Sequence, residues 1–482
     1  MKTKKRKPDC APPLLPPAKL VSKLLRLRER KGLDSFVAPE EQPEQTDVWG
    51  LCSEYVATDF DAMDDDVNRN AAYTRAFAAV PHGQTDWLEI GCGASATLTR
   101  LAVRHGPART HVTAFEVNAE SAAAAAAAMH TEGHEFRSRA NFITGRSTEP
   151  PVERTDLHGS RGRRFHVLLH EVFGVVASSE GCPHMLDHAC ASYLARPTSM
   201  RRSTMALCHS FKPWLAAPSQ SLPQCATRAI PSRAATFFTP CELSSASLDG
   251  CENLYSSSAV EPKVLLVPCA PLDELGLSAT CAALEMYRFG HGARLSDVEA
   301  RVATFEMSRD GILDCLGVFI WVDLGLGGPS PSQGTEARES PAASGALPSV
   351  YPFGDTSLEG AVADSEGDSE GGMGGAPRLN DFTSLCTGHT RRARTHATNW
   401  MNPLLLLPTP TRVRAGDTLR VCSSVRANST RPSYDFELTL YRRADVGGEH
   451  AGGRKDGRRV APETIGTLHV GFEDLYPDYG DL

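Results

Sequence analysis

The chain has 482 residues, of which 22% are charged and 41% hydrophobic, with a formal net charge of -8 and a mean hydropathy of -0.27. This length suits roughly two or three domains with a sizeable buried core. No apolar stretch approaches the roughly 18 residues that a membrane-spanning helix needs, so we expect neither a transmembrane enzyme nor a membrane partner. The negative charge argues against direct binding of nucleic acid and slightly favours basic substrates.

A basic, proline-rich segment, residues 1–45, opens the chain, and we expect it to be a flexible tail without a secretory signal. The 14 cysteines show no repeated CxxC spacing, and a chain of this size needs no disulfides. We therefore expect a reducing compartment, cytoplasmic, nuclear or both. A nuclear import signal and a merely solvated tail explain one basic cluster equally well: Lys4, Lys5, Arg6 and Lys7.

Residues 46–215 are predicted to contain N-terminal helices and a parallel α/β domain. An amphipathic helix is expected from Ala71 onward, because Ala, Tyr, Phe and Val recur there at helical spacing. Residues 85–103 and 110–129 each hold a short apolar strand followed by a helix, and this alternation is typical of βαβ units. The alanine run 122–128 predicts a packed helix, since alanine is the best helix former.

A glycine turn, LEIGCGASA, follows the first predicted strand. Gly91 and Gly93 would let the backbone approach a ligand closely at the carboxyl end of this strand. Ser95 and Ala96 occupy the place where a GxGxxG motif would continue, which argues against a pyrophosphate cradle. Glu116 ends the next strand, where a carboxylate can accept both hydroxyls of a ribose. Together these residues indicate a nucleoside cofactor without a phosphate chain.

A further apolar run, within FHVLLHEVFGVVASSEG, ends in a loop that carries Glu171 and Glu180. The carboxyl ends of strands in open α/β sheets are where ligands bind. Taken alone, the loop fits two solvated acids better than a site, because acidic side chains are usually exposed. Next to the motifs that precede it, the pair is interpreted as a clamp for one cation.

The motifs, taken in order, resemble those of protein arginine N-methyltransferases, a family of class I S-adenosylmethionine-dependent methyltransferases. LEIGCG and the Glu116 of AFEVN resemble cofactor motifs of the superfamily. MDDDVNRNAAY, ITGRSTE and the loop from Glu171 to Glu180 resemble the arginine methyltransferases in particular. The resemblance covers about two thirds of the chain. It implies an α/β fold, a Rossmann-like domain followed by a β-barrel substrate domain.

Residues 216–482 are expected to form this β-barrel domain. By resemblance, AIPSRAATFFTP at 229–240 starts the barrel, and MSRDGILDCLGVFIWVDLGLG at 307–327 is a barrel hairpin. The polar segment near 241–262 is similar in position to the arm by which relatives dimerise, so a homodimer is expected. Residues 327–391 are rich in Gly, Ser, Pro and acids and predict a disordered insertion.

The resemblance implies that five residues bind S-adenosyl-L-methionine. Arg69 would pair with its carboxylate, Gly91 and Gly93 would let its methionine portion approach, Glu116 would bind its ribose, and Glu149 its adenine amine. An arginine fork suits a carboxylate because two parallel hydrogen bonds fix its plane. For each charged residue taken singly, an ordinary surface salt bridge is the alternative.

The resemblance also implies the catalytic and substrate-binding residues. Glu171 and Glu180 would be catalytic, orienting the substrate guanidinium and stabilising its charge. Phe60 would lie over the substrate channel, and Trp400 would form its other wall by cation–π contact, with ordinary core packing as an equally good explanation. Asn399 stands where the family usually has histidine.

Protein arginine methylation is the favoured function, with arginine-rich substrates such as histones or RNA-binding proteins. An inactive scaffold with this fold is the first alternative, suggested by Ser95, Asn399 and the insertions. A small-molecule methyltransferase is the second, although it gives no reason for paired acids. The product stays open, because EVFGVVASSE is more similar to the symmetric-dimethylating branch, whereas MDDDVNRNAAY and STE are more similar to the monomethylating one.

A zinc site is a competing interpretation of GCPHMLDHAC, whose cysteines and histidines have a spacing that can bind metal: Cys182, His184, His188 and Cys190. No further ligand motif flanks this segment, and the resemblance places a packing helix there. We therefore expect no metal.

Overall fold

The computed structural model describes the chain in twelve stretches: residues 61–149, 165–195, 228–243, 255–256, 263–268, 272–289, 299–324, 351–352, 384–386, 401–427, 432–443 and 462–475. The basic tail, most of the expected dimerisation arm and most of the expected insertion lie outside these stretches. Phe60, Asn399 and Trp400 lie outside them as well. None of the described helices is long and apolar enough to cross a membrane.

A parallel sheet of five strands forms the first part of the molecule, in the order β3-β2-β1-β4-β5. Its strands are β1 Asp86–Ile90, β2 His111–Glu116, β3 Ala140–Thr144, β4 Val167–His170 and β5 Arg228–Ile230. All four pairings are parallel, and β1, β2 and β4 are almost entirely buried. The apolar runs of the sequence form these strands because a parallel sheet is covered on both faces.

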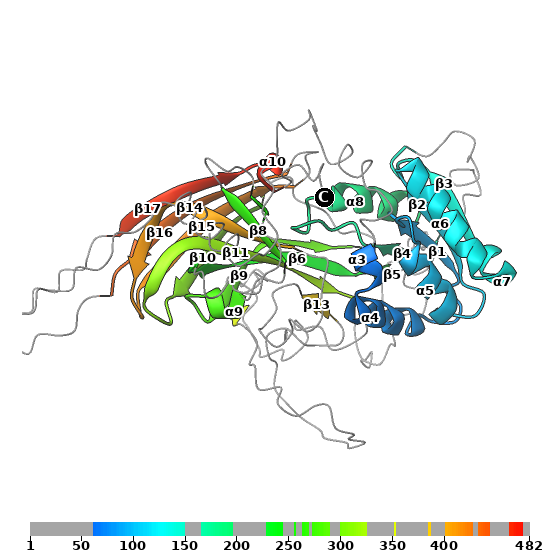
Figure 1. Ribbon diagram of the computed structural model, residues 1–482, viewed down its shortest axis with the longest axis horizontal. Helices are drawn as coiled ribbons and strands as arrows, with labels where there is room; N and C mark the ends of the chain where they lie inside the picture. The colour runs from blue at the N-terminus through cyan, green and yellow to red at the C-terminus, as the bar shows by residue number, and fades with distance from the viewer. Residues whose placement is uncertain are drawn as a thin grey trace, which may run out of the picture.

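Helices surround this sheet at one end of the molecule, and the antiparallel strands lie at the other (Figure 1). The helices are α3 Asp61–Asp64, α4 Val67–Ala78, α5 Thr97–His105, α6 Ala119–Thr131, α7 His134–Arg137 and α8 Cys182–Ser192. The alanine run forms α6, as expected, and Asn118 caps it by accepting a hydrogen bond from the Ser121 amide at 2.9 Å. Helix α4 begins at Val67, before the expected Ala71, because Asp66 caps it through the Arg69 amide at 2.9 Å.

Two antiparallel sheets form the second part. The eight-stranded sheet has the order β12-β9-β6-β11-β14-β8-β7, with β13 paired to β11, and the four-stranded sheet has the order β10-β15-β16-β17. The strands of the first are β6 Arg233–Cys241, β7 Tyr255–Ser256, β8 Val264–Pro268, β9 Thr280–Arg288, β11 Gly311–Asp323, β12 Tyr351–Pro352, β13 Ser384–Cys386 and β14 Met401–Val413. Those of the second are β10 Glu299–Glu306, β15 Thr418–Arg426, β16 Ser433–Tyr441 and β17 Glu463–Val470. Two short helices, α9 Leu272–Leu275 and α10 Phe472–Leu475, complete this part.

The two antiparallel sheets pack against each other through aromatic side chains. Phe238 of β6 contacts Phe305 of β10 and Phe436 of β16 edge-on, with ring centroids 5.5 and 5.7 Å apart. One hydrophobic core contains these rings and continues into the parallel sheet through Trp87 and Leu168. The α/β part and the β part are therefore joined by packed side chains, in the predicted order.

Three sequence-based expectations change in detail. The hairpin expected at 307–327 is wrong, because residues 311–323 form one continuous strand, β11, which pairs with β6 and β14 instead of folding back on itself. The parallel sheet continues past the expected boundary at residue 215, since β5 pairs with β4. Within the expected insertion, β12 pairs with β9 and β13 with β11.

Candidate functional site

Three neighbouring strands bring the candidate residues to one edge of the parallel sheet. Gly91 directly follows β1, Glu116 ends β2 and Glu171 directly follows β4. Strand β1 lies between β2 and β4, and all three run in the same direction. Their carboxyl ends therefore lie side by side, which is where open α/β sheets bind ligands.

The glycine turn after β1 has a backbone that side chains rarely permit. Gly91 and Gly93 have φ angles of 71° and 62°, in the left-handed region. A Cβ atom on Gly91 would also lie 2.7 Å from Cγ1 of Val172. The backbone therefore favours glycine at both positions, and the close approach of the loop after β4 adds a second reason at Gly91.

Glu116 braces this turn from the neighbouring strand. Its Oε2 accepts a hydrogen bond from the Gly93 amide at 2.9 Å, and its Oε1 accepts one from the Asn118 amide at 3.0 Å. Burial raises the pKa of Glu116, and the amides of Asn118, Gly93 and Val117 oppose this shift. A carboxylate has about four acceptor positions, so these amides leave room for a ligand.

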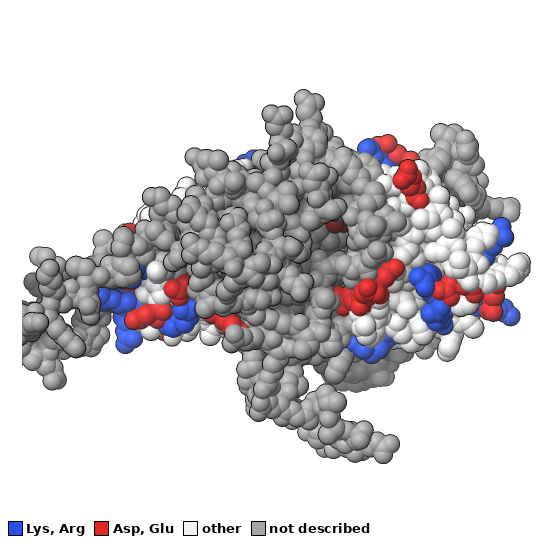
Figure 2. Space-filling view, viewed as in Figure 1, with Lys and Arg blue, Asp and Glu red and all other residues white. Residues whose placement is uncertain are grey.

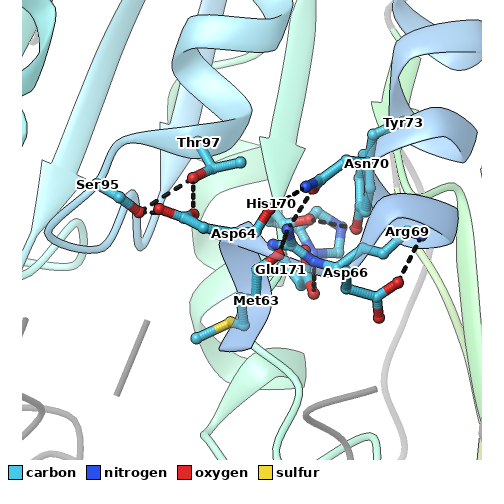
Figure 3. A network of polar contacts seen from close by, with 10 residues as sticks. All are labelled: Met63, Asp64, Asp66, Arg69, Asn70, Tyr73, Ser95, Thr97, His170 and Glu171. Carbon is cyan, nitrogen blue, oxygen red and sulfur yellow. Dashed lines mark hydrogen bonds and ion pairs between the residues drawn. The ribbon is translucent and has the colours of Figure 1, made fainter. Parts of the chain in front are cut away.

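Arg69 of α4 and Glu171 form a buried ion pair (Figure 3). Arg69 Nε lies 2.6 Å from Oε1 and 2.8 Å from Oε2 of Glu171, and Nη2 also contacts Oε2. Nη1 donates to the Met63 carbonyl at 3.2 Å and to Asn70 Oδ1 at 2.8 Å. Because a guanidinium has about five N–H donors, these contacts leave one N–H on Nη2. The two residues were expected to bind different groups, and the structure joins them.

Asp64 of α3 connects the N-terminal helix to the glycine turn (Figure 3). Its Oδ1 accepts a hydrogen bond from Ser95 Oγ at 2.9 Å and another from Thr97 Oγ1. The two hydroxyls are themselves 3.0 Å apart. Ser95, which departs from the glycine motif, therefore uses its hydroxyl to hold α3 over the turn. Sequence reasoning missed Asp64, although the acidic run ahead of α4 was a signal.

Glu180 ends the loop that begins at Glu171. Residues 172, 173 and 175–179 of this loop are buried, whereas Glu180 is partly exposed. Gly181 follows with a φ of 73° and begins α8. The charge of Glu180 contributes to the raised pKa of Cys182, after burial. One acid of the pair is thus buried in an ion pair, and the other is accessible at the far end of the loop.

The turn that follows β3 holds the remaining described candidate, Glu149. Its side chain is exposed, and its amide donates to the Arg146 carbonyl at 3.1 Å. Nearby Ser147 is buried, and its Oγ has no hydrogen-bond partner within the described stretches. Tyr193 donates to the Ser147 carbonyl at 2.6 Å, which fixes this turn.

Glu89, in the middle of β1, is a buried acid that sequence reasoning did not single out. It is 0% exposed, and burial raises its pKa to about 8, with Glu116 adding to the shift. Thr99 donates to its Oε2, while its Oε1 has no hydrogen-bond partner in the part of the chain that the structure describes. An acid inside an apolar strand, LEIG, was the available signal.

Surface charge near the site is acidic. Figure 2 shows acidic side chains where α3 and the start of α4 lie in Figure 1, and Asp65 is exposed there. A negative rim favours the approach of a cation.

The sequence GCPHMLDHAC forms α8, in which Cys182 and Cys190 are buried whereas His184 is exposed. Within the described stretches, no three His, Cys, Asp or Glu residues are grouped so that they could hold a metal.

No protein-family model matches the chain, and no curated protein matches its sequence. Among solved structures, the chain is similar to Arabidopsis thaliana protein arginine methyltransferase 10, with 12% identity and a TM-score of 0.51, over 88% of this chain and 99% of that one. It also matches the Trypanosoma brucei PRMT1 enzyme-prozyme heterotetrameric complex with AdoHcy, with 12% identity and a TM-score of 0.48, over 86% and 98% of the two chains. The fold is thus that of the Arabidopsis arginine methyltransferase.

Proposed function

We propose that this chain is a protein arginine N-methyltransferase, which transfers methyl groups from S-adenosylmethionine to guanidinium nitrogens of protein arginines. One observation carries the proposal: Glu171 and Glu180 delimit a mostly buried loop after β4, at the edge where the glycine turn and Glu116 also lie. The likeness of the fold to an arginine methyltransferase supports it.

The described residues fit a nucleoside with an amino-acid tail. Glu116 has room left for ribose hydroxyls, and Arg69 has one N–H left for a carboxylate. Gly91 and Gly93 leave the turn without side chains, and Glu149 is accessible for an adenine amine. S-adenosylmethionine would supply an electrophilic sulfonium methyl group at this edge.

Glu171 and Glu180 would act on the substrate. An arginine guanidinium has a pKa above about 12, so it arrives as a cation and is a weak nucleophile that must be held in place. Two carboxylates can orient this planar cation through bidentate hydrogen bonds and stabilise its charge. As a nitrogen is methylated it loses a proton, which one of the two carboxylates accepts.

Arg69 would position Glu171 for this task. Its ion pair fixes the plane of the carboxylate, and burial raises the pKa of Glu171 while the Arg69 charge opposes that shift. Phe60 and Trp400 lie outside the described residues and are proposed to form walls of the substrate channel, Trp400 by cation–π contact. We further propose that the substrates are arginine-rich proteins, that the chain forms a homodimer, and that it is located in the cytoplasm, the nucleus or both.

Incubation of the full chain with labelled S-adenosylmethionine and a Gly-Arg-rich peptide, followed by mass spectrometry, tests the proposal. We expect methylarginine, and the fragment ions identify the mono-, symmetric or asymmetric product. The matched control is Glu180→Gln, which keeps the size of the side chain but removes its charge. Peptide methylation at an equal rate by the wild type and by Glu180→Gln would contradict the assignment.

A non-catalytic scaffold is the second candidate, and one observation favours it: Arg69, expected to bind the cofactor carboxylate, directs most of its N–H donors to Glu171, Met63 and Asn70. Calorimetric titration with S-adenosylhomocysteine separates the two candidates. Binding without methylation of any arginine peptide supports the scaffold, whereas binding with methylation supports the enzyme. Methylation of small amines but of no peptide would support a small-molecule methyltransferase.

A further inference from the structure

We propose that Thr236, Glu285 and Tyr434 of the β part are positioning residues for the acidic loop, defined as residues 171–180. They lie in β6, β9 and β16, and thus in both antiparallel sheets. This inference rests on the proposed function, because it concerns how the two candidate catalytic acids are held relative to each other.

Thr236, Glu285 and Tyr434, called the anchor below, form hydrogen bonds with the middle of the acidic loop. The Ala177 amide donates to Thr236 Oγ1 at 2.8 Å, and the Ser178 amide donates to Glu285 Oε1 at 3.2 Å. The Ser178 hydroxyl lies 2.6 Å from the Tyr434 hydroxyl. Ala177 and Ser178 are both fully buried, so their amides depend on protein partners instead of water.

Glu285 is the centre of this network. It is itself fully buried, and its Oε1 also accepts a hydrogen bond from Thr236 Oγ1 at 2.7 Å. Its Oε2 accepts one from the Tyr287 hydroxyl at 2.7 Å. The Thr236 hydroxyl therefore links the Ala177 amide to the Glu285 carboxyl group through two consecutive hydrogen bonds. Such a network specifies one arrangement, because each buried partner would be left unsatisfied in another.

The acidic loop also contains hydrogen bonds between its own residues. Ser179 closes a turn on Val176, with its amide and its hydroxyl donating to the Val176 carbonyl at 3.2 and 2.8 Å. The Gly181 amide donates to the Ser178 carbonyl at 3.0 Å. These bonds shape a local turn, whereas the bonds to the β part set where that turn lies. Glu171 is held separately by Arg69, and the bonds to the β part act on the half of the loop that leads to Glu180.

Strand β6 offers a matched control for the anchor. Thr236 and Thr239 are both buried threonines of β6, but Thr239 Oγ1 donates to the Thr280 carbonyl at 3.0 Å instead of contacting the loop. Thr236→Val and Thr239→Val each remove one hydroxyl without changing the volume much. Thr236→Ser keeps the hydroxyl and serves as the rescue variant.

Steady-state kinetics of peptide methylation test the positioning role. We expect Thr236→Val to lower kcat by about tenfold to about a hundredfold, because a small misplacement of a catalytic group has effects of that size. Its KM for S-adenosylmethionine should stay within about twofold of wild type, as should kcat of Thr239→Val and Thr236→Ser. An equal loss of kcat in Thr236→Val and Thr239→Val, or no loss in either, would overturn the inference.

Hydrogen exchange at the Ala177 amide gives a readout that needs no activity. Thr236→Val should speed its exchange at least about tenfold, whereas Thr239→Val should leave it unchanged. If the wild type methylates no peptide but the two variants show this difference in exchange, the proposed function is contradicted and the anchor is not. Methylation by the wild type with unchanged exchange in Thr236→Val would contradict the anchor alone. If Thr236→Val does not fold, Tyr434→Phe tests the same anchor through the exchange of Ser178.

Discussion

Arg69 Nε lies 2.6 Å from Glu171 Oε1, and this ion pair joins α4 to the residue that follows β4. Both side chains are about 95% shielded from solvent, with exposed fractions of 5% and 4%. Removal of either side chain would therefore leave the other charge buried and unpaired, which is unfavourable. This relationship links the stability of the fold to the candidate chemistry.

The first prediction concerns the free energy of unfolding. Arg69→Met and Glu171→Met should each lower it by about 3–5 kcal/mol, because each leaves one buried charge unpaired. The double variant should lose less than the sum, since it removes both charges. Urea unfolding of all four proteins gives the coupling energy from a double-mutant cycle. Losses that simply add would show that the two charges do not stabilise each other.

The second prediction separates the two acids. Glu180→Gln should reduce methylation at least about a hundredfold while changing the free energy of unfolding less than Glu171→Gln does, because Glu180 is partly exposed. Glu171→Gln should lose both activity and stability. Both should still bind S-adenosylhomocysteine in calorimetry, whereas Glu149→Gln should weaken that binding. Full turnover in Glu180→Gln would remove it from the catalytic site.

The third prediction concerns Asp64, whose carboxylate is bound by Ser95 and Thr97. Asp64→Ala should lower the free energy of unfolding by about 1.5–3 kcal/mol, the usual contribution of hydrogen bonds to a charged group. It should also speed proteolysis within α3, measured by limited digestion and mass spectrometry. Asp65→Ala is the control, because Asp65 is exposed. Equal digestion of the two variants would argue against a role of Asp64 in holding α3.

The fourth prediction concerns pH. Burial raises the pKa of Glu89 from 4.5 to about 8, so the folded chain keeps a proton that the unfolded chain releases. The contribution of Glu89 to the free energy of unfolding has its full value below about pH 4.5. It then falls by about 1.4 kcal/mol per pH unit up to about pH 8. Glu89→Gln carries no such proton, so its unfolding free energy should exceed that of the wild type increasingly as pH rises through this range.

Urea unfolding at several pH values measures the effect of Glu89. Glu120→Gln provides the control, because it makes the same chemical change at an exposed position. A difference between Glu89→Gln and wild type that stays constant from about pH 5 to about pH 8 would contradict the raised pKa of Glu89.

The sequence predicted those features that depend on neighbours along the chain. Apolar runs predicted β1, β2 and β4, and the alanine run predicted α6, because periodicity and propensity are local properties. The glycine turn and the acids that end the strands were likewise found from their place after each run.

Pairing between distant segments could not be predicted in the same way. Strand β10 pairs with β15, for example Thr304 with Arg420, although β11 is the nearer strand in sequence. The contact of Arg69 with Glu171 joins residues 102 positions apart, and each has a plausible separate role. Glu285, like Glu89, is an acid within an apolar run, but the sequence does not predict its contacts with the acidic loop and with β6.

The anchor of the acidic loop has a consequence for biosynthesis. Tyr434 follows Ser178 by 256 residues. At about 5–20 residues per second, a ribosome adds this tyrosine roughly 13 to 50 seconds after the serine that it contacts. The parallel sheet can fold while the chain is still being made, but the contacts of the acidic loop with the β part are complete only when β16 emerges. A nascent chain that stops before β16 would carry both acids without the strand that completes their support.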